Sequence, residues 1–235
     1  MVALGRFLFR YRNAIFPFAC LLVLLPGPAL FDDPVRAAWV GAICALLGQL
    51  VRAGTIGLRY IVRGGRGGRV YADDLVTEGI YSHCRNPMYV GNILITLGVA
   101  LASNSLTTLL VALPLVLIAY SAIIAAEEEF LHQKFGAAFE AYCRDVPRWL
   151  PRLRGIAATF AHSEFHWRRL LVKEYGTPFG WIGVLILATL YNLSHNGWLP
   201  AELHTASTLL EILSAAAMLW LIVWLLKKTH VVVAD

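Results

Sequence analysis

Long apolar runs are the feature that most limits what this chain can fold into. A helix that crosses a bilayer needs about 20 mostly apolar residues, and six stretches reach or approach that length. They are residues 13–31, 36–51, 87–103, 105–126, 179–195 and 206–226. Hydrophobic residues make up 58% of the chain and charged residues only 15%, against about 25% charged in a typical soluble domain. We therefore predict an all-α, polytopic membrane bundle of about six transmembrane helices, in which residues 1–235 form a single membrane domain.

Prolines and a short polar segment divide these runs. The first run contains Pro17, Pro26 and Pro28, so its helix is predicted to kink or to end early. The second run is short and can continue past Arg52. Residues 103–105 are just long enough to turn a helical hairpin between the third and fourth runs. The basic N-terminal start also resembles a signal peptide, but the later apolar runs favour a retained anchor.

The Lys and Arg residues are distributed very unevenly around the apolar runs. With a cytosolic N-terminus, nineteen of the twenty fall on the cytosolic side and only Arg36 falls outside. The positive-inside rule therefore predicts six spans with both termini in the cytosol. Because this asymmetry accounts for the net charge of +5, no nucleic-acid partner is expected. The compact length and the lack of eukaryotic targeting signals favour a bacterial inner membrane.

The sequence offers two weak signals for bound ions. His162 and His166 lie four residues apart, which can place two metal ligands on one helical face. No third ligand accompanies them, so we expect no metal and interpret residues 161–176 as an interfacial amphipathic helix. The loop at 64–68 could hold a phosphate through backbone N–H groups or serve as a flexible connection. The four cysteines form neither a metal motif nor a disulfide framework.

Polar and aromatic residues gather around the predicted start of the third helix. Pro87 suits the first helical position, and Asn86 before it suits the N-cap. Tyr81, Arg85 and Tyr89 surround the same helix end, which is a good place for an anion or a polar cofactor. The alternative is an ordinary helix start with an arginine at the lipid headgroups.

Three carboxylates follow the fourth apolar run, at Glu127, Glu128 and Glu129. Negative charges near a helix C-terminus oppose the macrodipole, so local stability does not explain them. One of them could hold a cationic ligand, or all three could form a solvated acidic helix end. Downstream, Phe135, Phe139 and Tyr142 recur at helical spacing, which predicts core packing. Gln49 and Glu211 are polar residues within apolar runs and are expected to face the bundle interior.

Residues 73–151 resemble the core of the isoprenylcysteine carboxyl methyltransferase and phospholipid methyltransferase family of integral-membrane enzymes. The matching positions are Leu75, Val76, Gly79, Tyr81, Arg85, Asn86, Pro87, Tyr89, Gly91, Glu127, Glu128, Leu131, Phe135, Gly136, Phe139, Tyr142, Val146, Pro147, Arg148 and Pro151. Two departures are Asn86, where His is commoner, and Phe139, where the pattern has Tyr. The motif leaves residues 155–235 unexplained, as a C-terminal extension with two further spans.

The resemblance implies S-adenosylmethionine as the methyl donor, bound near the cytosolic membrane face. Carried over by position, the donor contacts are Asp73, Asp74, Leu75, Val76, Tyr81, Asn86, Pro87, Met88, Tyr89 and Glu127. The implied catalytic residues are Arg85, Glu127 and Arg148. A carboxylate can hold the cationic amino group of the donor, and an aromatic face such as that of Tyr89 can help to hold a cation.

One mismatch bears on the methyl acceptor. In the prenylcysteine branch of the family, an arginine that meets the substrate carboxylate lies four residues before the first Glu, where this chain has Ile123. We therefore expect a lipid or small lipophilic acceptor, unless Arg85 or Arg148 takes over that role. Two alternatives stay open: an NADPH-dependent membrane reductase of the sterol and steroid type, and a non-catalytic protein on the same scaffold. Membrane lipids are expected partners, and the oligomeric state is unknown.

Overall fold

Helices make up nearly all of the structured chain. The computed structural model describes residues 1–58, 70–161 and 163–232. Its elements are α1 (Val2–Ala19), η1 (Cys20–Leu24), α2 (Pro34–Leu58), η2 (Gly79–Ser82), α3 (Pro87–Ala102), α4 (Leu106–Phe135), α5 (Ala137–Asp145), α6 (Ile156–Ala161), α7 (Trp167–Glu174), α8 (Gly176–His195) and α9 (Leu203–Lys228). Within these ranges, five helical segments are long and apolar enough to cross a membrane, and α3 is apolar but only 16 residues long. The predicted all-α membrane bundle of about six helices is confirmed.

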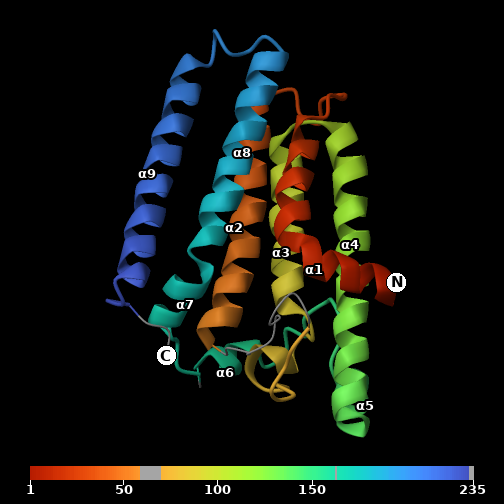
Figure 1. The fold of residues 1–235 in the computed structure, drawn as a ribbon. Helices are drawn as coiled ribbons and strands as arrows, with labels where there is room; N and C mark the ends of the chain where they lie inside the picture. The colour runs from red at the N-terminus through yellow and green to blue at the C-terminus, as the bar shows by residue number, and fades with distance from the viewer. Residues whose placement is uncertain (59–69, 162, 233–235) are drawn as a thin grey trace.

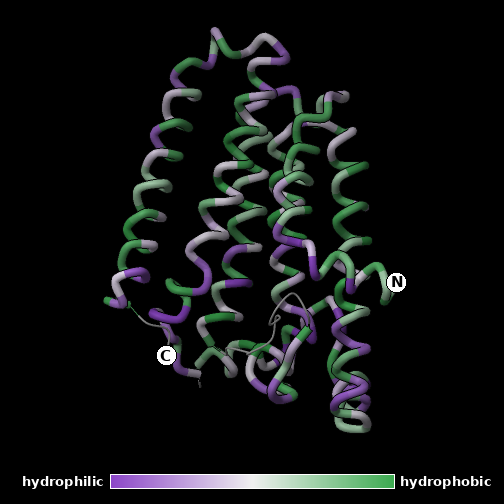
Figure 2. The backbone as a smooth tube through the Cα atoms, viewed as in Figure 1, coloured by the Kyte–Doolittle hydropathy of each residue, from purple (hydrophilic) through white to green (hydrophobic). Residues whose placement is uncertain are grey.

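The long helices run side by side, and the short ones gather at one end of the bundle. Figure 1 shows α5, α6 and α7 together at the lower end, with α9 at the edge beside α8. Figure 2 shows hydrophobic residues along the long helices and hydrophilic residues concentrated at that lower end. The bundle therefore has one polar end, where segments distant in sequence meet.

The connection between α3 and α4 is the tight hairpin that the sequence predicts. Asn104 adopts a positive φ of 52° in the turn, and the Ser105 side chain caps α4 by accepting a hydrogen bond from the Thr108 N–H. The Asn104 side chain also accepts hydrogen bonds from the N–H groups of Leu30 and Phe31. The hairpin is thereby fixed to the segment that joins α1 to α2.

The first helix differs from the sequence prediction in its boundaries. Helical structure starts at Val2 and ends at Leu24, whereas the apolar run suggested residues 13–31. Pro17 lies inside α1 and cannot donate a backbone hydrogen bond to Asn13, which accounts for the change in direction along α1 in Figure 1. Because the helix begins early, the basic residues near the N-terminus belong to it, and Arg12 reaches the bundle.

The two polar residues expected to face the bundle interior behave differently. Gln49 on α2 is buried, as predicted. Its side-chain amide donates a hydrogen bond to Glu174. Glu211 on α9 is exposed, so the prediction for it is wrong. The physical reason is that α9 lies at the edge of the bundle, and none of its most hydrophobic stretch is buried.

Glycines allow α2 and α3 to pack with their backbones close together. A Cβ atom at Gly41 would lie 2.4 Å from the carbonyl oxygen of Gly98, and one at Gly48 would lie 2.5 Å from that of Gly91. A Cβ atom at Gly91 would also lie 2.6 Å from Cγ of Arg52. Small residues permit such close approach between membrane helices, and here they let the Arg52 side chain lie against α3.

We expect Gly48→Ala and Gly98→Ala each to destabilise the protein, because the added methyl group would meet backbone atoms of the opposite helix. Overpacking of this kind costs about 1–3 kcal/mol. Gly180→Ala is the matched control, since a Cβ atom there meets nothing within 4 Å. Thermal unfolding in detergent provides the measurement. Equal stability of all three variants would contradict the close contact between α2 and α3.

Candidate active site

Two distant parts of the sequence motif are held together at the polar end of the bundle. The Arg85 N–H donates to the Pro147 carbonyl (2.9 Å), and the Arg152 N–H donates to the His83 carbonyl (3.0 Å). His83 Nδ1 donates in turn to the Arg152 carbonyl at 2.8 Å. Residues 83–86 and 147–152 are therefore paired, and this pairing fixes the start of α3.

Helix α3 begins at the predicted residue, but the side chain of its N-cap residue does not cap the helix. Pro87 is the first helical residue and Asn86 occupies the N-cap position. The Asn86 side chain makes no capping hydrogen bond and instead donates to the Arg148 carbonyl at 3.2 Å. Asn86 is only 3% exposed. Its side chain thus joins the start of α3 to the segment that follows α5.

Glu127 is a buried carboxylate that faces α3. It is 5% exposed, and the Tyr89 hydroxyl donates a hydrogen bond to its Oε1 at 2.9 Å. Leu131, one turn later on α4, is also buried, so the two residues share the inward face that the helical spacing predicts. Burying a carboxylate is costly unless it is paired or hydrogen-bonded, so its placement here is a specific feature of the site.

The neighbouring carboxylate, Glu128, pairs with two arginines. Its Oε2 lies 2.8 Å from Nη2 of Arg148, and its Oε1 lies 3.4 Å from Nη1 of Arg85. Arg85 also contacts Sγ of Cys143. Burial raises the pKa of the Cys143 thiol, although the nearby Arg85 acts in the opposite direction. The Cys143 thiol is therefore protonated at neutral pH. Glu128 and the two arginines form a structural ion-pair cluster.

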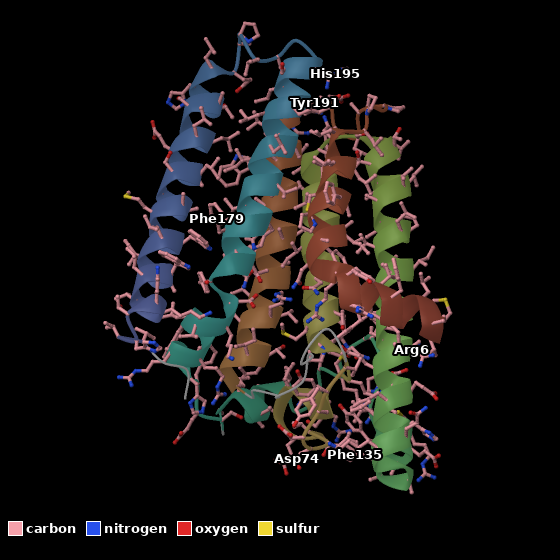
Figure 3. All side chains as sticks on the ribbon, in the orientation of Figure 1. Arg6, Asp74, Phe135, Phe179, Tyr191 and His195 are labelled. Carbon is pink, nitrogen blue, oxygen red and sulfur yellow. The ribbon has the colours of Figure 1, made fainter. Side chains whose placement is uncertain are left out.

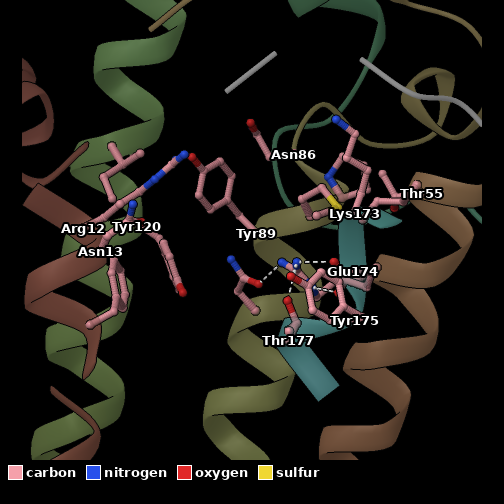
Figure 4. A pocket seen from close by; sticks show the side chains of 18 of the residues that line it. Arg12, Asn13, Thr55, Asn86, Tyr89, Tyr120, Lys173, Glu174, Tyr175 and Thr177 are labelled. Carbon is pink, nitrogen blue, oxygen red and sulfur yellow. Dashed lines mark hydrogen bonds and ion pairs between the residues drawn. The ribbon is translucent and has the colours of Figure 1, made fainter. Parts of the chain in front are cut away.

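A cavity of about 1010 Å³ lies between the four N-terminal long helices and the segment from α7 to α9. Seven of the residues that the sequence assigns to the site line it: Tyr81, Arg85, Asn86, Pro87, Met88, Tyr89 and Glu127. Ile123, the position of the acceptor mismatch, also lines it. Figure 4 shows Arg12, Tyr89 and Tyr120 at one side of this cavity and Lys173, Glu174 and Tyr175 at the other.

Five predicted site residues do not line the cavity: Asp73, Asp74, Leu75, Val76 and Arg148. Asp73 and Asp74 are exposed, and Figure 3 shows Asp74 at the lower end of the molecule. Leu75 packs against the cluster around Phe139 and Tyr142, and Val76 packs against Ile80 and Tyr81. The assignment of these five residues to a site stays a prediction.

The structure adds a polar network that the sequence did not reveal as part of the site. Glu174, at the end of α7, is 3% exposed, and its two carboxylate oxygens lie 2.6 and 2.8 Å from Nε and Nη2 of Arg52. Arg52 also donates to Asn92 and Thr177. Figure 4 shows this network at the cavity wall. The polarity of Gln49, which bonds to Glu174, was the signal in the sequence that pointed toward it.

The two weak sequence signals for bound ions fall partly or wholly outside the described residues. The glycine-rich loop at 64–68 lies in the undescribed segment 59–69, and His162 is also undescribed. Among the residues that the structure describes, no group of three His, Cys, Asp or Glu side chains could hold a metal ion. The choice at this loop between a phosphate site and a flexible connection therefore lies outside the described residues.

Comparisons with known proteins agree with the motif. The sequence model of the family described as Phospholipid methyltransferase matches residues 37–138. The Cobalt-zinc-cadmium resistance protein CzcN of Cupriavidus metallidurans is 31% identical over 83% of this chain and 88% of its own length. The Nickel-cobalt-cadmium resistance protein NccN of Alcaligenes xylosoxydans is 28% identical over 84% of this chain and 91% of its own. No solved structure matches the chain.

A shorter similarity connects the chain to named methyltransferases. The Protein-S-isoprenylcysteine O-methyltransferase of Schizosaccharomyces pombe is 41% identical over 78 residues, a third of each chain. The family match extends from α2 to the start of α5 and so includes Tyr81, Asn86, Tyr89 and Glu127 at the cavity. Sequence motif, membrane bundle and comparisons lead to one conclusion: the chain belongs to the isoprenylcysteine carboxyl methyltransferase and phospholipid methyltransferase family of integral-membrane proteins.

Proposed function

We propose that the protein transfers a methyl group from S-adenosylmethionine to a lipid or small lipophilic acceptor at the cytosolic membrane face. Family membership supports an enzyme of the methyltransferase kind, and the proposal concerns its donor, acceptor and site. The observation that carries it is the buried Glu127 carboxylate, hydrogen-bonded by Tyr89, in a cavity lined by the family motif.

The residues at this end of the cavity fit the donor. S-adenosylmethionine has a cationic amino group and a sulfonium, and it supplies an electrophilic methyl group when bound. Glu127 would hold the amino group through a charge-assisted hydrogen bond, and the ring of Tyr89 or Tyr81 would lie against a cationic or planar part. Asp73, Asp74, Leu75 and Val76 are assigned to the donor by the resemblance alone.

The chain contributes positioning rather than proton transfer. Methyl transfer is a direct displacement, so holding donor and acceptor in line supplies much of the rate enhancement. No histidine lines the described part of the cavity, and both lining carboxylates, Glu127 and Glu174, are already hydrogen-bonded. A thiolate or carboxylate acceptor would need no base. Arg85 lines the cavity and would orient the acceptor, whereas Arg148, through Glu128, would hold the pocket in shape.

The matches do not favour the reductase alternative, because the named enzymes among them are methyltransferases. A titration of detergent-solubilised protein with S-adenosylmethionine and, separately, with NADPH distinguishes the two readings. Saturable binding of S-adenosylmethionine is expected. Binding of NADPH alone would support a reductase, and binding of neither would support a non-catalytic protein.

We expect Glu127→Gln to weaken the binding of S-adenosylmethionine by roughly 10- to 150-fold, since a hydrogen bond to a charged group is worth about 1.5–3 kcal/mol. Glu129→Gln is the matched control, because Glu129 lies on the same helix but is exposed and bonded to Gln133. Isothermal titration with each folded variant measures the effect. Unchanged affinity in Glu127→Gln would remove this residue from the donor site.

The orientation of the bundle is testable by cysteine labelling in a background without the four native cysteines. Asn196 is exposed after α8, and Glu140 is exposed on α5 at the opposite end of the bundle. With both termini in the cytosol, Asn196→Cys should react with an impermeant reagent added to intact cells, whereas Glu140→Cys should react only after lysis. The reverse labelling pattern would overturn the proposed orientation.

A further inference from the structure

The first half of α1 lies across α4 instead of along the bundle. Figure 1 shows the chain running from the N-terminus across α4 before it turns to follow the other long helices. The two helices meet at Gly5, where a Cβ atom would lie 1.8 Å from the carbonyl oxygen of Ala122. The apolar run of α4 ends at Ala126, and Glu127 follows it. The crossing therefore lies near the level at which apolar residues of α4 give way to charged ones.

This half of α1 has one buried face and one exposed face. Gly5 and Phe9 are buried and lie one turn apart. Leu4, Phe7 and Tyr11 are 44%, 55% and 44% exposed, and their spacing of three and four residues places them along one face of the helix. A helix with exposed aromatic and aliphatic side chains beside arginines is typical of segments that lie in the membrane interface.

A groove of about 590 Å³ lies between the first half of α1 and the end of α4. Phe7 and Phe9 on α1 and Ala126 and Phe130 on α4 contribute apolar walls to it. Within the part of the chain that the structure describes, the groove shares no lining residue with the cavity that contains Glu127. The groove is therefore a separate feature of the molecule.

Two arginines without a carboxylate partner line this groove. Arg6 and Arg10 are exposed, and neither forms an ion pair with another described residue. Arg10 lies with its guanidinium carbon 5.5 Å from the centroid of the Tyr11 ring. The groove contains one carboxylate among the described residues, that of Glu129, which accepts a hydrogen bond from the Gln133 side chain at 2.6 Å. Its lining therefore carries an excess of positive charge.

The spacing of the two arginines suits a single anionic group. Arg6 and Arg10 are four residues apart, so their side chains leave the helix one turn apart on the same side. Figure 3 shows Arg6 at the outer side of the molecule, beside α4. A guanidinium matches the geometry of a phosphate through paired N–H donors. Two such groups at one end of an apolar groove fit a ligand with a phosphate and an apolar body.

The level of the groove and its charge favour one class of ligand. Phosphates of membrane lipids lie at the interface where apolar helices meet charged residues, and aromatic side chains gather there. A zwitterionic lipid carries a cationic group beside its phosphate, which the two arginines would repel. An anionic phospholipid has no such cation, and basic residues near a membrane surface attract it.

We propose that the groove between α1 and α4 binds an anionic phospholipid of the membrane. Arg6 and Arg10 pair with its phosphate, and its acyl chains lie against Phe7 and Phe130. The site goes beyond the proposed function, because neither donor nor acceptor occupies it. The lipid joins the first half of α1 to α4 and so supports the crossing of the two helices.

The bound lipid would also support a wall of the main cavity. Phe9 lines the groove and packs in one cluster with Tyr120 and Ile123. Both of these α4 residues line the cavity that contains Glu127. The groove and the cavity thus lie on either side of one packed layer of side chains.

Native mass spectrometry of the full chain, released from a neutral detergent, tests the binding directly. The protein is titrated with phosphatidylglycerol, phosphatidylcholine and, as a source of phosphate without acyl chains, glycerol phosphate. We expect one phosphatidylglycerol to be retained with an affinity about tenfold or more above that for phosphatidylcholine, and no glycerol phosphate. Equal affinity for the two lipids would overturn the inference, as would glycerol phosphate that binds as tightly as phosphatidylglycerol.

Charge variants test the role of the two arginines. The double variant Arg6→Gln, Arg10→Gln should weaken the binding of phosphatidylglycerol by about 10- to 30-fold, whereas Arg6→Lys with Arg10→Lys should retain most of it. Arg144→Gln with Arg154→Gln is the matched control, because both residues are exposed at the polar end of the bundle and neither lines the groove. Equal weakening by the control would show general charge attraction and contradict the site.

A variant that fills the groove tests its position without changing charge. Gln133 is exposed and lines the groove, so the indole of Gln133→Trp would occupy part of it. Gln133→Ala is the matched control, because it loses the same hydrogen bond to Glu129 but adds no bulk. We expect most of the phosphatidylglycerol retained by the native protein to be lost in Gln133→Trp and kept in Gln133→Ala. Unchanged retention in a folded Gln133→Trp protein, checked by thermal unfolding, would contradict the groove as the binding place.

Discussion

The ion pair between Arg52 and Glu174 is the interaction on which the arrangement of this molecule depends. Polar groups inside a membrane bundle must find hydrogen-bond partners within the protein. Here the Glu174 carboxylate accepts hydrogen bonds from the Arg52 guanidinium and the Gln49 amide. The pair joins α2 in the family core to the end of α7 in the C-terminal extension. Arg52 also lies against α3, where a Cβ atom at Gly91 would meet its side chain. Core and extension therefore share one cavity rather than forming separate bundles.

Adjacent carboxylates on α4 have different roles because they face different neighbours. Glu128 faces Arg85 and Arg148, which themselves belong to the two paired segments at 83–86 and 147–152. Glu127 is turned toward Tyr89 and the cavity. The ion-pair cluster holds the start of α3 and the end of α4 together, and this keeps the Glu127 carboxylate at a constant place in the cavity. The same motif thus supplies both the frame and the charged group of the candidate site.

Features that depend on local pattern were predictable from the sequence. Pro87 at the start of α3, the turn around Asn104 and the inward position of Gln49 follow from residue type and apolar periodicity, and the structure confirms them. Features that depend on tertiary neighbours were not predictable. Glu174 lies in the short helix α7, and it is buried because it pairs with Arg52. Glu211 is exposed because α9 is an edge helix. The motif also gave no sign that the segment from α7 to α9 lines the cavity.

In the proposed reaction, a donor held at Glu127 meets an acceptor that enters the cavity from the membrane. The most direct test follows the methyl group itself. Purified protein in vesicles of bacterial lipids is supplied with methyl-tritiated S-adenosylmethionine, and the label is partitioned between organic and aqueous phases after the reaction. We expect label in the organic phase with the native protein and none with the Glu127→Gln protein. If the protein binds the donor but transfers no label to an organic-soluble product, the proposed reaction is contradicted.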